Sequence, residues 1–238
     1  MRLLFIRHGD PDYAIDGLTD QGQKEALALS ERLQEEKIDF LYCSPLGRAK
    51  RTAYPYLKNA NRKAAILPWL QEFNHPCQMP QGVHTCCWDW LPQDLQDREI
   101  LFSKDWLSDP AYEGEARESV REVFAAFDGL LEKHGYRKDG RYYRVERANH
   151  DTLCFFCHFG IESLLLSRLL DVSALVFWQG CAAPPASVTT VYSEERREGL
   201  ASFRIQSFGD VSHLAKKGYA PSFSARFCEC FSDDTRHD

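Results

Sequence analysis

Short apolar runs alternate with longer amphipathic stretches along most of this chain of 238 residues. Three of the runs are RLLFI at 2–6, IDFLYC at 38–43 and TLCFFC at 152–157. Runs of this length, bounded by polar residues, glycine or proline, are typical of buried strands. Strands that alternate with helices predict an α/β fold. We expect a three-layer α/β/α sandwich, with a mostly parallel sheet and helices on both of its faces.

Several helix starts carry recognisable capping residues. Thr19 or Asp20 is expected to cap a helix within 19–37. Ser44 followed by Pro45 predicts the N-cap and the first residue of a second helix, because proline lacks the N–H that the first helical turn leaves without a partner. Two further helices are expected over 115–134 and 161–170.

The remaining strands are expected near the edges of the sheet. Residues 64–70 predict a third strand, close to an edge because Pro68 cannot donate to a ladder. The stretches at 186–193 and 201–208 predict a final hairpin, joined by the charged turn EERREG at 194–199.

The domain organisation is expected to be simple. We predict a single domain over 1–230, with an irregular lid or insertion at 74–112 and a polar tail at 231–238. Trp88 and Trp90 are interpreted as packing residues of the lid, with stacking on a substrate as the alternative.

Composition and charge narrow the class of partner. The net charge of −6 argues against binding to nucleic acid or to an anionic membrane surface. No segment has the ~18–20 apolar residues that a membrane span needs, and the start of the chain has no signal-peptide apolar region. We therefore expect a cytoplasmic protein whose nine cysteines are mostly free thiols. The sequence does not determine oligomeric state, and a homodimer stays open.

Two stretches resemble cofactor or metal sites. CFFCH at 154–158 has the spacing of a covalent haem attachment site, but without a sign of export we favour a packed strand with free thiols. Zinc binding is the minor alternative for a group of five residues: His75, Cys77, His84, Cys86 and Cys87. Their spacing is not that of a standard zinc knuckle, so an ordinary loop is favoured. We expect no metal and no cofactor.

Polar side chains follow three of the expected strands. Arg7 and His8 follow the first, Ser44 leads from the second to Arg48, and His158 follows a later one. Ligands of open α/β sheets bind beyond the carboxyl ends of the strands. We therefore expect these side chains to converge in one cationic pocket.

Such a pocket suits a phosphoryl group. Arginine forks match phosphate oxygens, and a helix N-terminus adds positive potential. A neutral imidazole can attack phosphorus without first losing a proton. A carboxylic acid is then needed to protonate the leaving alcohol and later to deprotonate water.

The sequence resembles the histidine phosphatase superfamily, which includes the phosphoglycerate mutases. The matching segments run in family order from one end of the chain toward the other: Arg7-His8-Gly9, Leu18-Thr19 with Gly22, Ser44-Pro45-Leu46-Gly47-Arg48-Ala49 with Thr52, Leu70-Gln71-Glu72, His158-Phe159-Gly160 and Ser212-His213-Leu214. The stretch after Glu72 departs from the family pattern, so the resemblance does not identify the substrate.

The resemblance implies a role for each of five residues. His8 would become phosphorylated, and Arg7, Arg48 and His158 would hold the phosphoryl oxygens. Glu72 would act first as acid and then as base. The resemblance implies no metal, because fixed cations take the place that Mg²⁺ has in other phosphoryl transferases.

Three other carboxylates are weighed against this assignment. Asp109 and Glu113 are reserve candidates for the acid, while Glu162 is interpreted as a residue that merely favours a helix N-terminus. The favoured function is hydrolysis of a small-molecule phosphate monoester through a phosphohistidine. A mutase-type phosphoryl transfer and a non-catalytic phosphate-binding module are the alternatives.

Overall fold

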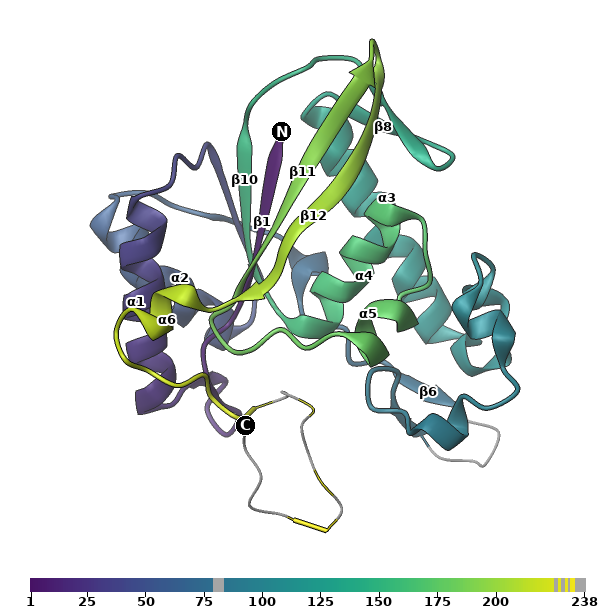
Figure 1. The fold of residues 1–238 in the computed structure, drawn as a ribbon, viewed down its shortest axis with the longest axis horizontal. Helices are drawn as coiled ribbons and strands as arrows, with labels where there is room; N and C mark the ends of the chain where they lie inside the picture. The colour runs from purple at the N-terminus through teal and green to yellow at the C-terminus, as the bar shows by residue number, and fades with distance from the viewer. Residues whose placement is uncertain (79–83, 225–226, 228–229, 231, 234–238) are drawn as a thin grey trace.

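The structure is a computed structural model that describes residues 1–78, 84–224, 227, 230, 232 and 233. Within these residues the largest sheet has eight strands (Figure 1). In spatial order they are β5 (Ala65–Ile66), β4 (Phe40–Cys43), β10 (Thr152–Cys157), β1 (Arg2–Arg7), β11 (Val188–Arg197), β12 (Leu200–Asp210), β9 (Tyr142–Val145) and β8 (Tyr136–Asp139). Two short ribbons accompany it, β2 (Pro11–Asp12) with β3 (Gly17–Leu18) and β6 (Pro76–Gln78) with β7 (His84–Cys86).

The sheet is mixed, which corrects the prediction of a mostly parallel one. Strands β5, β4, β10 and β1 pair in parallel, whereas β11, β12, β9 and β8 continue from β1 in antiparallel pairs. The antiparallel half consists of two hairpins, and strands joined by a tight turn must run in opposite directions. The β11–β12 turn is also shorter than expected. Both strands extend into the charged stretch, and Gly199 takes a positive φ of 76° at the turn.

Helices cover both faces of the sheet, as predicted. On one side lie α1 (Asp20–Gln34), α2 (Gly47–Asn59) and α6 (Ser212–Ala215), and on the other α3 (Glu115–Lys133), α4 (Phe159–Leu170) and α5 (Leu175–Gly180) (Figure 1). Alternation along β1 explains the two layers of core. Leu4 and Ile6 join the apolar cluster under α1 and α2, whereas Leu3 and Phe5 join the cluster under α3 and α4.

Two local predictions near the site need correction. Thr19 caps α1 as expected, and its hydroxyl accepts from the Gly22 amide. Ser44, in contrast, does not cap a helix, because α2 begins at Gly47 after an extended turn. The strand expected over 64–70 is reduced to the two residues of β5, at the sheet edge as predicted, followed by the 3-10 helix η1 (Pro68–Leu70).

In the irregular stretch at 74–112, the described residues after β7 pack beside α5 (Figure 1). After β6 and β7 this stretch forms short 3-10 helices, η2 (Pro92–Asp94), η3 (Glu99–Phe102), η4 (Trp106–Ser108) and η5 (Pro110–Tyr112). Leu101, Trp106 and Tyr112 are buried in the same apolar cluster as the inner face of α3. Most of the expected tail, 231 and 234–238, lies outside the described residues. Among the described helices, none combines the length and apolarity of a membrane span.

Candidate active site

A cavity of about 370 Å³ opens where β1 ends and α2 begins. Arg7 is the last residue of β1, His8 follows it, and Arg48 lies in the first turn of α2. Glu72 follows η1 and also lines this cavity, which we name the catalytic cavity. The other lining residues are Tyr13, Asn74, Cys86, Trp88 and Phe159. Two of the three groups singled out in the sequence, Arg7 with His8 and Arg48, thus line one cavity. His158 is not among the described lining residues, but its buried ring lies beside that of His8.

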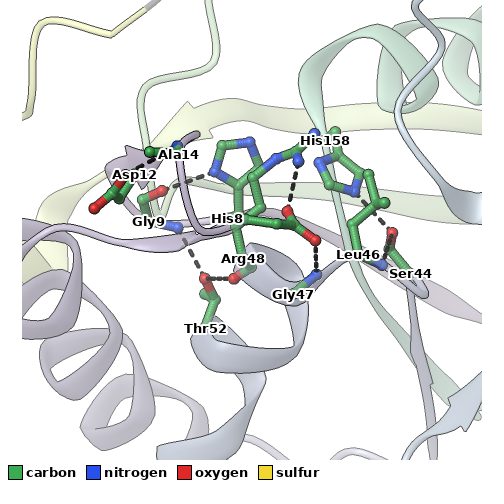
Figure 2. Close-up of polar contacts among 11 residues, drawn as sticks. His8, Gly9, Asp12, Ala14, Ser44, Leu46, Gly47, Arg48, Thr52 and His158 are labelled. Atoms are coloured by element: carbon green, nitrogen blue, oxygen red, sulfur yellow. Dashed lines mark hydrogen bonds and ion pairs between the residues drawn. The ribbon is translucent and has the colours of Figure 1, made fainter.

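A close crossing of backbone fixes the loop that carries His8. A Cβ atom at Gly22 would lie 2.2 Å from the carbonyl oxygen of Asp10, a distance that real Cβ atoms do not reach. Glycine at position 22 therefore lets α1 approach the loop after β1. The Gly9 amide donates to the Thr52 hydroxyl at 2.9 Å, which ties the same loop to α2 (Figure 2).

The orientation of the His8 ring determines which nitrogen is free to react. Its Nδ1 lies 2.7 Å from the Gly9 carbonyl oxygen (Figure 2). A carbonyl only accepts, so Nδ1 must carry the ring proton and Nε2 keeps its lone pair. Burial, followed by the nearby Arg7 charge, lowers the pKa of His8 well below 6.5. The ring is therefore neutral near pH 7.

His158 lies next to His8, with 5.0 Å between the ring centroids. Its Nε2 lies 2.8 Å from the Ser44 hydroxyl oxygen, which also accepts from the Leu46 amide at 3.2 Å (Figure 2). A hydroxyl oxygen can accept two hydrogen bonds and donate one, so the contact holds the His158 ring in place in either of its neutral tautomers. Ser44, expected as a helix cap, thus orients a histidine instead.

The surroundings of His158, like those of His8, disfavour the charged form of its ring. Burial, then the nearby His8, Arg48 and Arg7, lowers the pKa of His158 well below 6.5. Its Nδ1 is buried, with no hydrogen-bond partner among the described residues. A dianion in the cavity would oppose these effects, because it favours the charged imidazolium and accepts from an N–H donor.

The two arginines are held by different partners. Arg7 is buried, and its Nη1 donates to the Ala183 carbonyl. Arg48 pairs with Asp16 at 2.8 Å, and the other Asp16 oxygen accepts from the Gly47 amide at 2.5 Å. Although burial opposes it, the Gly47 amide and Arg48 together bring the pKa of Asp16 below its ordinary value. Asp16 therefore stays charged and fixes Arg48, a role that no local sequence pattern indicated.

Glu72 has the environment of a carboxylic acid that can hold a proton. Its Oε1 accepts from the Phe73 amide at 2.9 Å and the Ile161 amide at 3.1 Å. Burial raises the pKa of Glu72, although Arg7 and the two amides oppose that rise. A Cβ atom at Gly160 would lie 2.7 Å from Oε1, so any larger residue there would displace this carboxyl from its present position.

The reserve acids do not line the catalytic cavity. Asp109 is buried in a salt bridge with Arg98 and accepts from the Ala111 amide at the start of η5, while Glu113 is exposed. Of the three candidate acids, only Glu72 reaches the cavity.

A second buried carboxyl was misjudged from the sequence. Glu162, in the first turn of α4, is 0% exposed. Burial raises the pKa of Glu162 to about 8, although the Thr189 hydroxyl and the Arg7 guanidinium act in the opposite direction. The sequence could have indicated this, because Glu162 stands inside the apolar run IESLLLSRLL. A helix made of such a run has no polar face that would expose the glutamate, and a fully buried glutamate is rare enough to be noted.

The haem and zinc interpretations gain no support. Cys154 and Cys157 are fully buried on opposite faces of β10, within the two separate apolar clusters. Among the described residues, no three His, Cys, Asp or Glu side chains converge as metal ligands would. The side chain of His84 lies outside the described part of the structure.

Trp90 packs against Tyr112 as predicted.

By its fold the chain is an α/β protein of the phosphoglycerate mutase-like type. The family model of the histidine phosphatase superfamily (branch 1) matches residues 3–206, and the chain belongs to this superfamily.

Characterised relatives and solved structures agree with this assignment. An adenosylcobalamin/α-ribazole phosphatase of Escherichia coli is 29% identical over 76% of this chain and 87% of its own length. A phosphoserine phosphatase 1 of Hydrogenobacter thermophilus is 24% identical over 86% and 92%. A crystal structure of phosphoserine phosphatase from Entamoeba histolytica with phosphoserine superposes with a TM-score of 0.59 at 17% identity, over 90% of this chain and 98% of that one.

Proposed function

We propose that this protein hydrolyses a small-molecule phosphate monoester through a phosphohistidine formed on His8. One observation carries the proposal. The hydrogen bond from His8 Nδ1 to the Gly9 carbonyl leaves Nε2 unprotonated in a cavity that also holds Arg7, Arg48 and Glu72. A neutral imidazole nitrogen beside two guanidinium groups is a nucleophile placed where a phosphoryl group would bind.

In the first step the Nε2 lone pair of His8 forms a bond to phosphorus, and the ester P–O bond breaks. The protonated Glu72 carboxyl gives its proton to the leaving oxygen, so the alcohol departs neutral. In the second step the Glu72 carboxylate takes a proton from water, whose oxygen attacks phosphorus as the P–N bond breaks. Inorganic phosphate, neutral His8 and protonated Glu72 are restored.

Fixed positive charge lowers the barrier of both steps. Arg7, Arg48 and His158 are proposed to hold the three oxygens of the transferring group, where negative charge is concentrated. Their partners Ala183, Asp16 and Ser44 hold these groups in place before substrate arrives. The guanidinium groups of Arg7 and Arg48 are preorganised charges that need no rearrangement during the reaction. His158 is neutral in the free site and gains its charge only when a bound dianion favours the imidazolium.

Hydrolysis is favoured over mutase-type transfer by the lining of the catalytic cavity. A mutase must bind a second anionic group and protect the phosphohistidine from water. Within the described lining, Arg7, His8 and Arg48 are the basic groups, and all three are already assigned to one phosphoryl group. The relatives reported above bear names of phosphatases, which supports the same choice.

A lid at 74–112 within a single domain over 1–230, a cytoplasmic location and a homodimer stay predictions.

The test is release of phosphate from a chromogenic aryl phosphate by wild type, His8→Ala and the exposed control His150→Ala. We expect loss of turnover in His8→Ala alone, together with acid-labile phosphate on wild-type His8. Turnover that survives in His8→Ala would reject the nucleophile. Transfer of the label to an alcohol rather than to water would indicate a mutase. Phosphate binding without any turnover would indicate a binding module.

A further inference from the structure

A second hollow adjoins the catalytic cavity. It has a volume of about 730 Å³, and its lining includes Trp88, Leu91, Trp178 and Phe227. Trp88 lines both hollows, so the two are neighbours at this residue. Small-molecule sites commonly enclose about 300–1,000 Å³. The two hollows together therefore offer room for a group much larger than the phosphoryl group that the cations hold.

The aromatic residues around this junction are held in place. The Trp88 indole donates to the Phe73 carbonyl at 3.1 Å, and the Trp178 indole donates to the Gly160 carbonyl at 3.0 Å. The Phe73 and Trp178 rings stack, with 5.6 Å between centroids and an interplanar angle of 12°. A rigid aromatic wall loses little freedom when a ligand packs on it, which favours binding.

A second aromatic contact joins the two hollows. Phe159 lines the catalytic cavity and Phe227 lines the second hollow, and their rings lie 5.5 Å apart. Together with Trp88, they give the junction between the hollows an aromatic surface. Flat aromatic groups pack on such surfaces with offset or edge-to-face geometry.

The charges of the lining distinguish between classes of leaving group. The cations of the catalytic cavity are Arg7, His8 and Arg48, all assigned to the phosphoryl group. Within the described lining of the second hollow, the only carboxylate is Asp89, and no lysine, arginine or histidine accompanies it. Among the lining residues that the structure describes, a carboxylate on the leaving group would therefore meet like charge and no cationic partner.

We propose that the substrate is a phosphate monoester of an uncharged, aromatic alcohol, whose ring system packs against Trp88 and extends into the second hollow. This inference rests on the proposed function for its reaction, but its binding part can be tested without turnover. Trp88 thereby acts as a specificity-determining residue, which takes up the alternative of stacking on a substrate that the sequence left open.

The test compares esters that differ in aromaticity but not in leaving-group chemistry. Benzyl and cyclohexylmethyl phosphate have leaving alcohols of similar acidity and size, and 2-naphthylmethyl phosphate adds a second ring. We expect kcat/KM to follow the order naphthylmethyl, benzyl, cyclohexylmethyl, with phosphoserine last. Trp88→Ala should lower kcat/KM for the naphthylmethyl ester about tenfold more than it lowers that for ethyl phosphate.

Two further variants separate a lost contact from a damaged fold. Trp88→Phe keeps an aromatic ring and should retain most of the naphthylmethyl preference, even if Trp88→Ala does not fold. Phe102→Ala removes an aromatic side chain of the same 74–112 region that is 49% exposed and lines neither hollow. It should leave the order of the esters unchanged.

Calorimetric binding of the same esters to His8→Ala gives a readout that needs no turnover. Tighter binding of the naphthylmethyl than of the cyclohexylmethyl ester, lost on addition of Trp88→Ala, would support the aromatic subsite even if wild type released no phosphate. Equal binding of the two esters, or a preference that persists in the Trp88→Ala variant, would overturn the aromatic subsite. Phosphate release by wild type would in that case still support the proposed phosphatase activity.

Discussion

The buried carboxyl of Glu162 should make the stability of this protein depend on pH in a defined way. The side chain is 0% exposed, and burial raises its pKa from 4.5 to about 8. An unfolded chain gives up this proton near pH 4.5, whereas the folded chain keeps it to about pH 8. The contribution of the neutral carboxyl is therefore fully present below pH 4.5 and is lost as pH rises toward 8.

The magnitude follows from the two pKa values. Each pH unit between them is worth about 1.4 kcal/mol of unfolding free energy. Between pH 5 and pH 8 the wild type should lose about 3–4 kcal/mol from this group. Glu162→Gln removes the titration but keeps the shape, so this loss should be absent from the variant. The difference between the two proteins isolates the effect, because all other titrating groups contribute to both.

The measurement is urea denaturation of wild type and Glu162→Gln at several values between pH 5 and pH 8. We expect Glu162→Gln to gain in stability relative to wild type as pH rises. Glu118→Gln is the matched control, because Glu118 lies on the surface of α3, where its side chain is 63% exposed. That variant should follow the wild-type curve. Parallel curves for wild type and Glu162→Gln would refute a buried, neutral carboxyl at this position.

Two further substitutions test how the catalytic groups are held. Ser44→Ala removes the hydroxyl beside His158 Nε2 and should lower kcat by roughly tenfold or more. Ser44→Thr keeps a hydroxyl and should retain much of the wild-type kcat. Equal kcat in wild type, Ser44→Ala and Ser44→Thr would exclude a positioning role for Ser44. Gly160→Ala places a methyl group against Glu72 Oε1, so kcat should fall by roughly tenfold or more. Gly129→Ala adds a methyl group that meets only open space, so it should not change kcat; equal losses in both glycine variants would contradict the steric reasoning.

The parts of the fold that the sequence predicted are those that local pattern encodes. Alternation along β1 sends Leu4 and Ile6 to one face and Leu3 and Phe5 to the other, so two helix layers follow from the strand itself. The cap at Thr19 also depends on neighbouring residues alone. The β11–β12 hairpin was predicted from its two strand-like stretches, but its antiparallel pairing with β1 was not, because that pairing joins segments that no local signal connects.

The site divides in the same way. By itself, the sequence determined which chemical groups stand at the ends of the strands, because a strand end and its polar residues are set within a few positions of the chain. Only the tertiary structure decided that Ser44 meets a histidine 114 residues away, that Glu162 is sealed from water, and that Trp88 lines two hollows. Hydrogen-bond partners, pKa values and cavities depend on distances between remote segments, and those distances exist only once the whole chain has packed.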